Sequence, residues 1–209
     1  SDSADVKMDY YNNDGTWETM CANGARCAAL YMYEKNIVTS ENMIFEGGDG
    51  QHEVEIIGAN SVKLKMLTPK YCSKKIELLE VSGFHIDSGA THFVVEYNNI
   101  DDDTAKDLGS KIRYNDLFTP RGINVNFYKV INSHKINVKT YEKGVEDLMM
   151  SCGSGSIACI YHLSKIEQVE SPVHVHVKGG ILKVDFDNDW SNIWISGHAE
   201  IENDLIIKI

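Results

Sequence analysis

The alternation of apolar and polar residues predicts a chain built mainly of short β-strands. Residues 54–67 match two strands joined by a turn at residues 58–60. Residues 173–187 match a second hairpin, with Gly179 and Gly180 as its two-residue turn. Segments rich in β-branched and aromatic residues predict further strands at 91–97, 123–131, 136–142 and 192–201. We therefore expect sheets that are antiparallel at least in part.

Three segments have the pattern of helices, and two of them share an unusual beginning. Residues 102–113 predict a surface helix, whereas residues 24–35 and 154–165 predict helices that each start just after a cysteine. The preceding segments, CANG at 21–24 and CGSG at 152–155, align as cysteine, small residue, short polar residue and glycine. This internal repeat indicates two related halves.

The repeated motif has a chemistry that packing alone does not require. The first amides of a helix have no partner inside the helix, and small residues let a ligand approach them, so each motif can bind an anion. The same positive helix end is expected to lower the pKa of a cysteine and favour the thiolate, which can take a proton from carbon. Cys21 and Cys152 could then serve as a base and an acid.

Three other roles for Cys21 compete with catalysis: half of a disulfide, a zinc ligand, or a buried core thiol. The chain has five cysteines, an odd number without a dense framework, which favours a reduced, cytoplasmic protein. Cys21 and Cys27 are six residues apart and no C-x-x-C pair occurs, so no metal site is expected. A core thiol remains open for Cys21 and is expected for Cys27 and Cys159, while Cys72 has no assignable role.

Composition narrows the class of protein and of partner. The 209 residues are 43% hydrophobic and 24% charged, as in ordinary globular proteins, and are enough for one large domain or two small ones. A net charge of −11 opposes binding to nucleic acid and to anionic lipid surfaces. No apolar run approaches the roughly 18 residues that span a bilayer. We expect neither nucleic acid nor membrane as a partner.

Two long motifs resemble signatures of the diaminopimelate epimerase family. The stretch YNNDGTWETMCANGARC at 11–27 is similar to that family's Asn-x-Asp-Gly-Ser segment leading to Met-Cys-Gly-Asn-Gly-x-Arg-Cys. The stretch YEKGVEDLMMSCGSGSIA at 141–158 is similar to its Glu-Arg-Gly segment leading to Cys-Gly-Thr-Gly. Shorter family-like segments follow in family order at 87–95, 121–127, 177–184 and 195–201. The resemblance covers nearly the whole chain.

The resemblance implies a racemase that works without pyridoxal phosphate or any other cofactor. Its fold would be mixed α/β, with largely antiparallel sheets around central helices in two pseudo-symmetric domains. The corresponding division places residues 1–72 in the N-terminal domain and 73–196 in the C-terminal domain, with 197–209 returning to the first as a strand. One cysteine from each domain would face the substrate α-carbon from opposite sides, so that one removes the proton and the other returns it.

The resemblance also assigns residues of the active site. The implied catalytic residues are Cys21, Cys152, His92 and Glu142, the last two near the reacting centre. The implied substrate-binding residues are Asn12, Ala22, Asn23, Gly24, Asn124, Lys143, Gly153 and Ser154, among which the loop amides would hold the α-carboxylate and Asn12 and Asn124 the distal end. From the residues alone, Asn12 could instead shape a turn with Asp14 and Gly15, and His92 could be an ordinary strand histidine.

The chain departs from the family pattern mainly among the distal residues. Lys143 replaces an arginine that binds the distal carboxylate, which keeps the charge but loses the bidentate fork. Ala90 replaces an asparagine of the same region, and Ala22 replaces a glycine of the first loop. The chemistry is thus better supported than the substrate.

The expected activity is conversion of LL-diaminopimelate to meso-diaminopimelate in lysine and cell-wall biosynthesis, with a small-molecule amino acid as the substrate. Racemisation of a different amino acid is the main alternative, and a non-catalytic or isomerase relative of the same fold is a weaker one. The family also implies a possible homodimer. Because the family begins with a strand and a glycine-rich segment that this sequence lacks, we expect the sequence to be a fragment that is poorly stable or inactive alone.

Overall fold

The computed structural model describes residues 3–12 and 15–202, and strands are its predominant secondary structure. The strands of the first half are β1 (Val6–Lys7), β2 (Tyr10–Tyr11), β3 (Trp17–Glu18), β4 (Asn42–Gly47), β5 (Gly50–Gly58), β6 (Ser61–Met66) and β7 (Lys70–Tyr71). Those that follow are β8 (Ile76–Leu78), β9 (Val81–Asp87), β10 (Thr91–Glu96), β11 (Asn124–Asn132), β12 (Lys135–Glu142), β13 (Asp147–Leu148), β14 (Val173–Val177), β15 (Gly180–Phe186) and β16 (Ile193–His198). The helices are α1 (Ala22–Glu34), α2 (Asp102–Arg113) and α3 (Gly153–Lys165), with a short 3₁₀ turn at Asp116–Phe118.

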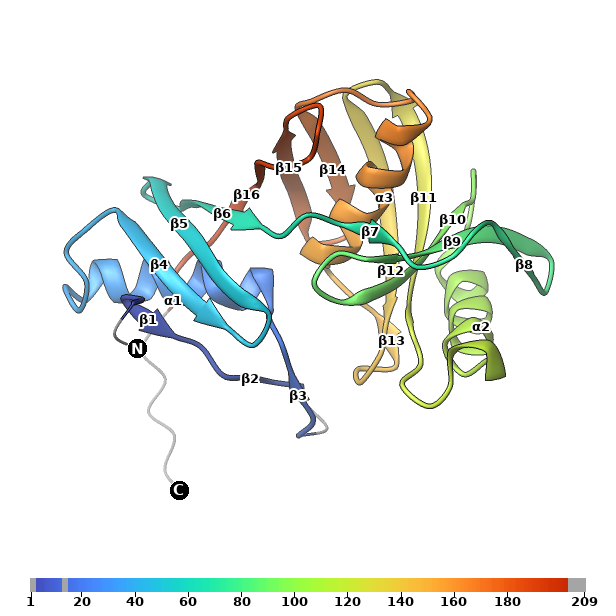
Figure 1. Ribbon diagram of the computed structural model, residues 1–209, viewed down its shortest axis with the longest axis horizontal. Coiled ribbons are helices and arrows are strands. Elements are labelled where there is room, and N and C mark those ends of the chain that lie inside the picture. The colour runs from blue at the N-terminus through green and yellow to red at the C-terminus, as the bar shows by residue number, and fades with distance from the viewer. Residues whose placement is uncertain (1–2, 13–14, 203–209) are drawn as a thin grey trace.

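The strands form one long sheet that runs through both halves of the molecule (Figure 1). Its order is β1-β4-β5-β6-β16-β15-β14-β12-β11-β10-β9-β7, and β2 and β3 form a separate two-stranded sheet. The pairs β1/β4, β10/β11 and β12/β14 are parallel and the other described pairs are antiparallel, as the sequence led us to expect. Both predicted hairpins are present, although the second turn consists of Lys178 and Gly179, because Gly180 already pairs with Val177.

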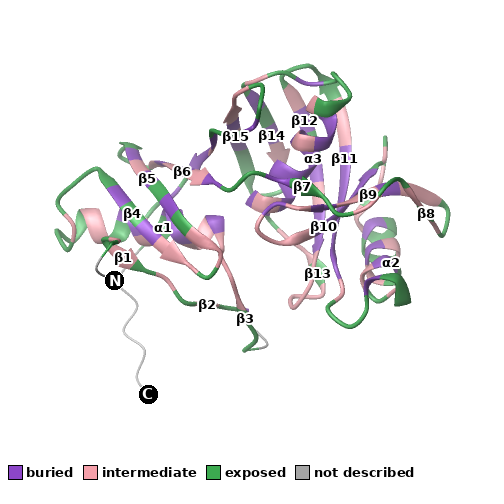
Figure 2. Cartoon of the chain, viewed as in Figure 1, coloured by how far each residue is buried: buried purple, intermediate pink, exposed green. Residues whose placement is uncertain are grey.

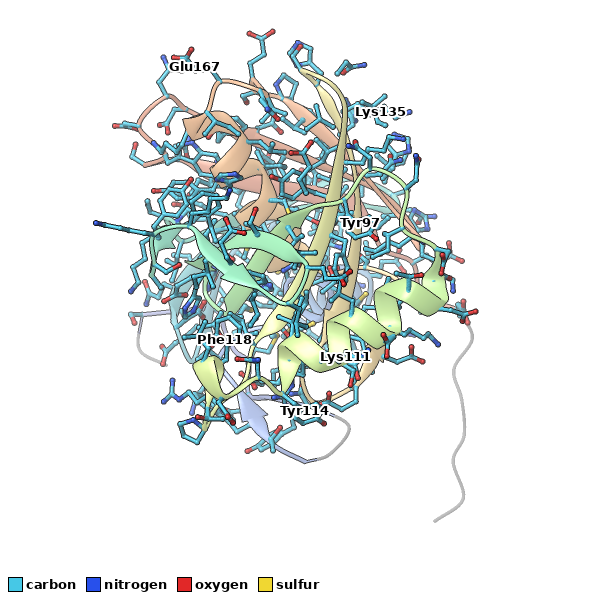
Figure 3. The ribbon with its side chains drawn as sticks, turned by 90° about the vertical axis from the view of Figure 1, so that its right-hand side faces the viewer. Tyr97, Lys111, Tyr114, Phe118, Lys135 and Glu167 are labelled. Atoms are coloured by element: carbon cyan, nitrogen blue, oxygen red, sulfur yellow. The ribbon has the colours of Figure 1, made fainter. Side chains whose placement is uncertain are left out.

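Each half places one helix against its part of the sheet. Helix α1 packs on β5 and β6, α3 packs on β9, β10 and β11, and the two helices contact each other. Helix α2 covers β11, β12 and β13 from the side seen in Figure 3, close to Phe118 of the 3₁₀ turn. The mixed α/β fold that the sequence predicted is therefore confirmed.

The core follows from the period of two along the strands. In β6, Val62, Leu64 and Met66 are buried while the lysines between them are partly exposed. Helix α1 is buried along one side, whereas α3 is buried along most of its length (Figure 2). One large apolar cluster joins residues of α1, α3 and the strands of both halves, and a second lies under α2. None of the described helices is long and apolar enough to cross a bilayer.

The sheet crosses both of the domain boundaries that the sequence suggested. Strand β7 lies before residue 73 and pairs with β9, and β16 spans residue 197 and pairs with β6. The division into 1–72, 73–196 and 197–209 thus remains a prediction. The part of the expected return strand after residue 202 lies outside the described residues.

Candidate active site

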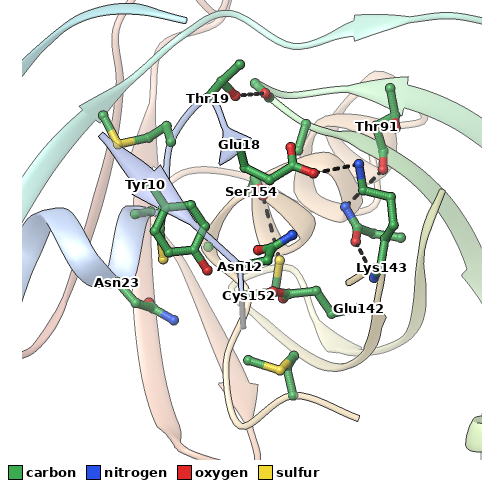
Figure 4. A pocket seen from close by; sticks show the side chains of 18 of the residues that line it. Tyr10, Asn12, Glu18, Thr19, Asn23, Thr91, Glu142, Lys143, Cys152 and Ser154 are labelled. Atoms are coloured by element: carbon green, nitrogen blue, oxygen red, sulfur yellow. Dashed lines mark hydrogen bonds and ion pairs between the residues drawn. The ribbon is translucent and has the colours of Figure 1, made fainter. Parts of the chain in front are cut away.

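A cavity of about 330 Å³ lies where the starts of α1 and α3 face each other. Ten of the twelve site residues predicted from the sequence line it: Cys21, Cys152, Glu142, Asn12, Ala22, Asn23, Asn124, Lys143, Gly153 and Ser154. Figure 4 shows several of these side chains converging from both halves of the chain. The two that do not line it, Gly24 and His92, lie behind its wall.

The two cysteines have the same local structure, as the repeat predicted. Each is the residue before the first turn of its helix, with extended backbone angles of φ −123° and ψ 108° at Cys21 and φ −131° and ψ 111° at Cys152. Each sulfur accepts a hydrogen bond of 3.4 Å from an amide three residues on, that of Gly24 or of Gly155. Because the Gly24 and Gly155 amides already donate to the cysteine sulfurs, only the amides that precede them in each helix can bind an anionic ligand.

The two motifs touch each other directly. A Cβ atom added to Gly153 would lie 2.8 Å from the Cβ of Ala22, so only glycine fits opposite this alanine. The Asn23 side chain donates a 3.0 Å hydrogen bond to the carbonyl of Ser151, just before the second cysteine. Arg26 holds Asn23 in place with a 2.7 Å hydrogen bond to its Oδ1. The relative position of the two thiols is fixed by these contacts.

Burial sets the protonation of Cys152, against the expectation from the helix end. Desolvation and the neighbouring Glu142 carboxylate raise the pKa of Cys152 to about 12, and they outweigh the hydrogen bonds from Gly155 and Ser154. The prediction of a lowered pKa is therefore wrong for this thiol. Burial also raises the pKa of Glu142 to about 7, although a hydrogen bond from the Cys152 thiol acts in the opposite direction. The Cys152 thiol is thus next to the Glu142 carboxyl group, whose pKa lies near neutral pH.

A buried chain of hydrogen bonds supports Cys152 from behind. Thr140 donates to Asn126 Oδ1 at 2.9 Å, and Asn126 Nδ2 lies 2.9 Å from His92 Nδ1. Because the amide nitrogen can only donate, His92 Nδ1 accepts and its proton is on Nε2. That nitrogen donates at 3.0 Å to Ser154 Oγ, which lies 3.6 Å from Cys152 Sγ. The serine hydroxyl is thus free to donate to the sulfur.

His92 lies behind the reacting centre, fully enclosed. Its side chain is inaccessible to solvent, and burial lowers its pKa to about 3, with a further lowering by the charges of His85 and Lys143 and an opposing contribution from Asn126. The imidazole is therefore neutral at physiological pH. Its geometry suits a fixed donor to Ser154 and not a group that exchanges protons with a ligand in the cavity.

Cys21 has a different partner. The Tyr10 hydroxyl hydrogen-bonds to the Cys21 side chain, and burial together with the charges of Cys21, Glu142 and Glu18 raises the pKa of Tyr10 to about 12. A phenol that keeps its proton is a permanent donor to the sulfur. Tyr10 thus supports one thiol as Ser154 supports the other.

The opposite end of the cavity holds the residues assigned to the distal part of a substrate. Asn124 Oδ1 accepts a 2.9 Å hydrogen bond from the Lys143 amide, which fixes the backbone there. Asn12 is buried and packs on Gly144, where an added Cβ would lie 2.5 Å from its Nδ2. The amide of Gly15 also bonds to the Asn12 carbonyl, so the predicted turn forms, while Asp14 lies outside the described residues. Lys143 forms an ion pair of 2.6 Å with Glu18.

The other cysteines match their predictions unevenly. Cys159 is fully buried, as expected of a core thiol, and Cys72 is exposed. The prediction is wrong for Cys27, which is exposed because Ala25 and Ala29 occupy the core-facing side of α1. In residues 3–12 and 15–202, no three His, Cys, Asp or Glu side chains group closely enough to hold a metal ion.

Sequence reasoning missed several residues that shape the site: Tyr10, Glu18, Arg26, Arg121 and Asn126. Tyr10 comes directly before the stretch 11–27, and Glu18 and Arg26 lie within it, so their proximity to Cys21 could have been noticed. Asn126 follows Asn124 by two residues on β11, and the period of two already placed both on one face of the strand. Arg121 carries no such signal.

The arrangement can move a proton between two faces of one carbon. Two thiols line the same cavity from opposite halves of the chain, and free amides at two helix starts can bind the carboxylate beside that carbon. One thiolate can take the α-proton while the opposite thiol gives its own. The described residues supply a donor hydrogen bond to each sulfur.

Similarity to solved structures shows the fold. The chain superposes on a PhzF-family phenazine biosynthesis protein of Bacillus anthracis with a TM-score of 0.72 at 13% identity, covering 99% of this chain and 82% of that one. It also superposes on a hydroxyproline epimerase from Agrobacterium vitis, solved with bound trans-4-hydroxy-L-proline, with a TM-score of 0.70 at 14% identity over 88% and 65% of the two chains.

Similarity in sequence is higher and shows the family. The family model described as diaminopimelate epimerase matches residues 84–201. The diaminopimelate epimerase of Chlorobaculum tepidum is 34% identical over 202 residues, covering 95% of this chain and 79% of that protein. That of Aquifex aeolicus is also 34% identical, over 92% of this chain and 71% of its own length. The chain therefore belongs to the diaminopimelate epimerase family and is an isomerase.

Proposed function

We propose that the protein inverts the α-carbon of diaminopimelate, converting the LL form to the meso form in lysine biosynthesis, with Cys21 and Cys152 as opposed acid and base. The observation that carries the proposal is the placement of the two cysteines, each at the start of a helix from a different half, in the wall of one cavity. The names of the relatives supply the substrate.

The raised pKa of Cys152 supports an order of events. A turnover that begins with Cys152 as a thiol has Cys21 as the base, so the α-proton passes to Cys21 and the Cys152 proton passes to the opposite face of the carbon. The reverse turnover begins from the exchanged protonation states. Atoms and charge balance, because each cycle consumes one thiolate and one thiol and regenerates one of each.

Stabilisation of the carbanion falls to the amides and to the protein's exclusion of water. The amides of Ala22, Asn23, Gly153 and Ser154 surround the position where the α-carboxylate would lie, and two helix starts add their positive ends. The Gly24 amide, which is bonded to Cys21, is committed to the thiol. Glu142 lines the same cavity and would accept a hydrogen bond from the substrate ammonium group when ionised.

The proposal is tested by α-proton exchange in deuterated water, followed by NMR with LL-diaminopimelate as the substrate. We expect the wild-type protein to place deuterium at the α-carbon and to form meso-diaminopimelate, and we expect neither Cys152→Ser nor Cys21→Ser to form the meso product, because inversion needs both thiols. Cys72→Ser removes an exposed thiol outside the cavity and is the matched control. Absence of exchange in the wild type, or full conversion to the meso form by either cavity variant, would contradict the proposal.

A second candidate, racemisation of another amino acid, is favoured by one observation. Lys143 and Ala90 both line the cavity where family members have an arginine and an asparagine. The same exchange assay with a panel of amino acids, including proline, separates the two. Exchange that is faster on a panel member than on diaminopimelate would favour this candidate.

A further inference from the structure

An ion pair between the two halves divides the candidate active site from a second cavity. Glu18 Oε1 and Lys143 Nζ are 2.6 Å apart, and about a quarter of each side chain is exposed. Glu18 ends β3 and Lys143 follows β12, so the pair joins segments far apart in sequence (Figure 4). Both residues line the candidate active site and also the second cavity, of about 420 Å³. The pair therefore lies at the wall that the two cavities share.

Positive charge exceeds negative charge among the described residues that line the second cavity. Arg121 lines both cavities, and no described residue forms a hydrogen bond or an ion pair with it. Arg113 also lines the second cavity but is committed to Glu146 at 3.0 Å. Glu18 is the sole acidic residue among the described residues lining that cavity. A carboxylate in the second cavity meets two cations that can bind it, Lys143 and Arg121, and one competing carboxylate. The candidate active site adds the carboxyl groups of Asp87 and Glu142 on its own side of the pair.

The backbone around the pair is fixed while the charged ends are free to exchange partners. The Lys143 amide is bonded to Asn124, and Gly144 is held against Asn12 in a left-handed conformation with φ +86°. The preceding residue, Glu142, hydrogen-bonds to the Cys152 thiol. A substrate whose reacting carbon lies between the thiols therefore extends from that point toward Glu18 and Lys143 in the same cavity.

We propose that Glu18 is a specificity-determining residue that binds a distal ammonium group of the substrate while Lys143 and Arg121 bind the distal carboxylate. This inference rests on the proposed function, since diaminopimelate carries an amino-acid group at each end. Its second zwitterionic end inserts between Glu18 and Lys143 and replaces one internal ion pair with three intermolecular ones, one each to Glu18, Lys143 and Arg121. Both charged side chains remain paired throughout.

The same geometry disfavours a distal end with a single charge. A substrate with a distal carboxylate alone can bind Arg121, but it gains Lys143 only by taking it from Glu18, which leaves the Glu18 carboxylate unpaired and next to a like charge. A substrate with a neutral end leaves the internal pair intact and gains nothing from it. The ion pair thus favours a substrate whose distal end carries both an ammonium group and a carboxylate over one whose distal end carries only a carboxylate.

The test compares two ligands that differ only in the distal amino group, LL-diaminopimelate and L-2-aminopimelate. The readouts are KM and kcat for α-proton exchange and the dissociation constant from calorimetry, in the wild type and in Glu18→Gln. We expect Glu18→Gln to weaken diaminopimelate binding about 10- to 100-fold, as for loss of a charge-assisted hydrogen bond, and to strengthen aminopimelate binding. Glu18→Asp, which keeps the charge, should keep the wild-type order of the two ligands.

Glu77→Gln is the matched control, because Glu77 forms an exposed ion pair of 3.1 Å with Lys75 on β8, outside both cavities. It should leave both dissociation constants unchanged. The inference is overturned if Glu18→Gln changes the two ligands by the same factor or changes neither. Absence of exchange in the wild type would instead defeat the proposed function, and calorimetry would then still decide the preference between the two ligands.

Discussion

A single added methyl group should affect the two equivalent glycines of the repeat in opposite ways. Gly24 and Gly155 occupy the same position after Cys21 and Cys152. A Cβ atom at Gly24 would lie 3.5 Å from Cys21 Cβ, an ordinary contact, whereas one at Gly155 would lie 2.1 Å from Asn126 Oδ1 and 3.2 Å from Cys152 Sγ. We therefore expect Gly24→Ala to be tolerated by the fold and Gly155→Ala to destabilise it.

The expected magnitude follows from what Asn126 holds. Relief of the contact to an ordinary 3.4 Å requires a shift of about 1.3 Å in an amide that is inaccessible to solvent and bonded to His92 and Thr140. Leaving those two buried partners unpaired costs about 1–3 kcal/mol each, while alanine in place of glycine in a helix gains about 1 kcal/mol. Gly155→Ala should thus lower the free energy of unfolding by about 3 kcal/mol, and Gly24→Ala should leave it unchanged or slightly higher.

Equilibrium unfolding in urea, followed by circular dichroism, measures both changes on the same scale. Asn126→Ala in the Gly155→Ala background removes the clash and tests its origin, because the second substitution should then cost much less than it does in the wild type. Equal stability of the two glycine variants, or a Gly155→Ala protein as stable as the wild type, would refute the role given to Asn126.

Three further changes test the environment of the thiols. Tyr10→Phe removes the hydroxyl that hydrogen-bonds to Cys21 and should lower kcat for α-proton exchange about 10-fold, the effect of one hydrogen bond to a charged sulfur, with little change in the free energy of unfolding. The pKa of the Glu142 carboxyl group is raised from 4.5 to about 7, so this group binds more protons in the folded state than in the unfolded state. Its contribution to stability therefore falls as pH rises from 4.5 to 7. Glu142→Gln should remove that fall in urea titrations across this range. His92, whose pKa is lowered from 6.5 to about 3, has the opposite sign, so stability should be lost as pH falls below 6.5 and His92→Gln should reduce that loss. A pH dependence unchanged in either variant would show that the group is not the source.

The sequence predicted the repeated local structure correctly because short-range rules govern it. A cysteine followed by small residues and a helix pattern determines the cap at Cys21 and at Cys152 without help from the rest of the chain. Helix α2 was predicted with its observed bounds, 102–113, since Asp101 caps its start and the apolar period is clear. Of the twelve site residues predicted from the resemblance to the family, ten line one cavity in the structure.

The failures concern quantities that depend on tertiary contacts. The pKa of Cys152 follows from its burial and from Glu142, which is ten residues earlier in sequence and adjacent only in the fold. His92 was expected at the reacting centre, but its burial and its bond to Ser154 depend on how α3 packs on β10. Residues that meet only through tertiary packing have no fixed spacing in the sequence, so a sequence pattern cannot predict such contacts.

The contact between Ala22 and Gly153 links the evolution of the two halves. One methyl group fills the space between the helix starts, since a second one would lie 2.8 Å from the first. The residue that fits at position 22 therefore depends on the residue at position 153, and the reverse also holds. A lineage that has glycine at position 22 gains room for alanine at 153, whereas a chain with alanine at 22 is restricted to glycine there. Sequences of this family should accordingly not have alanine at both positions.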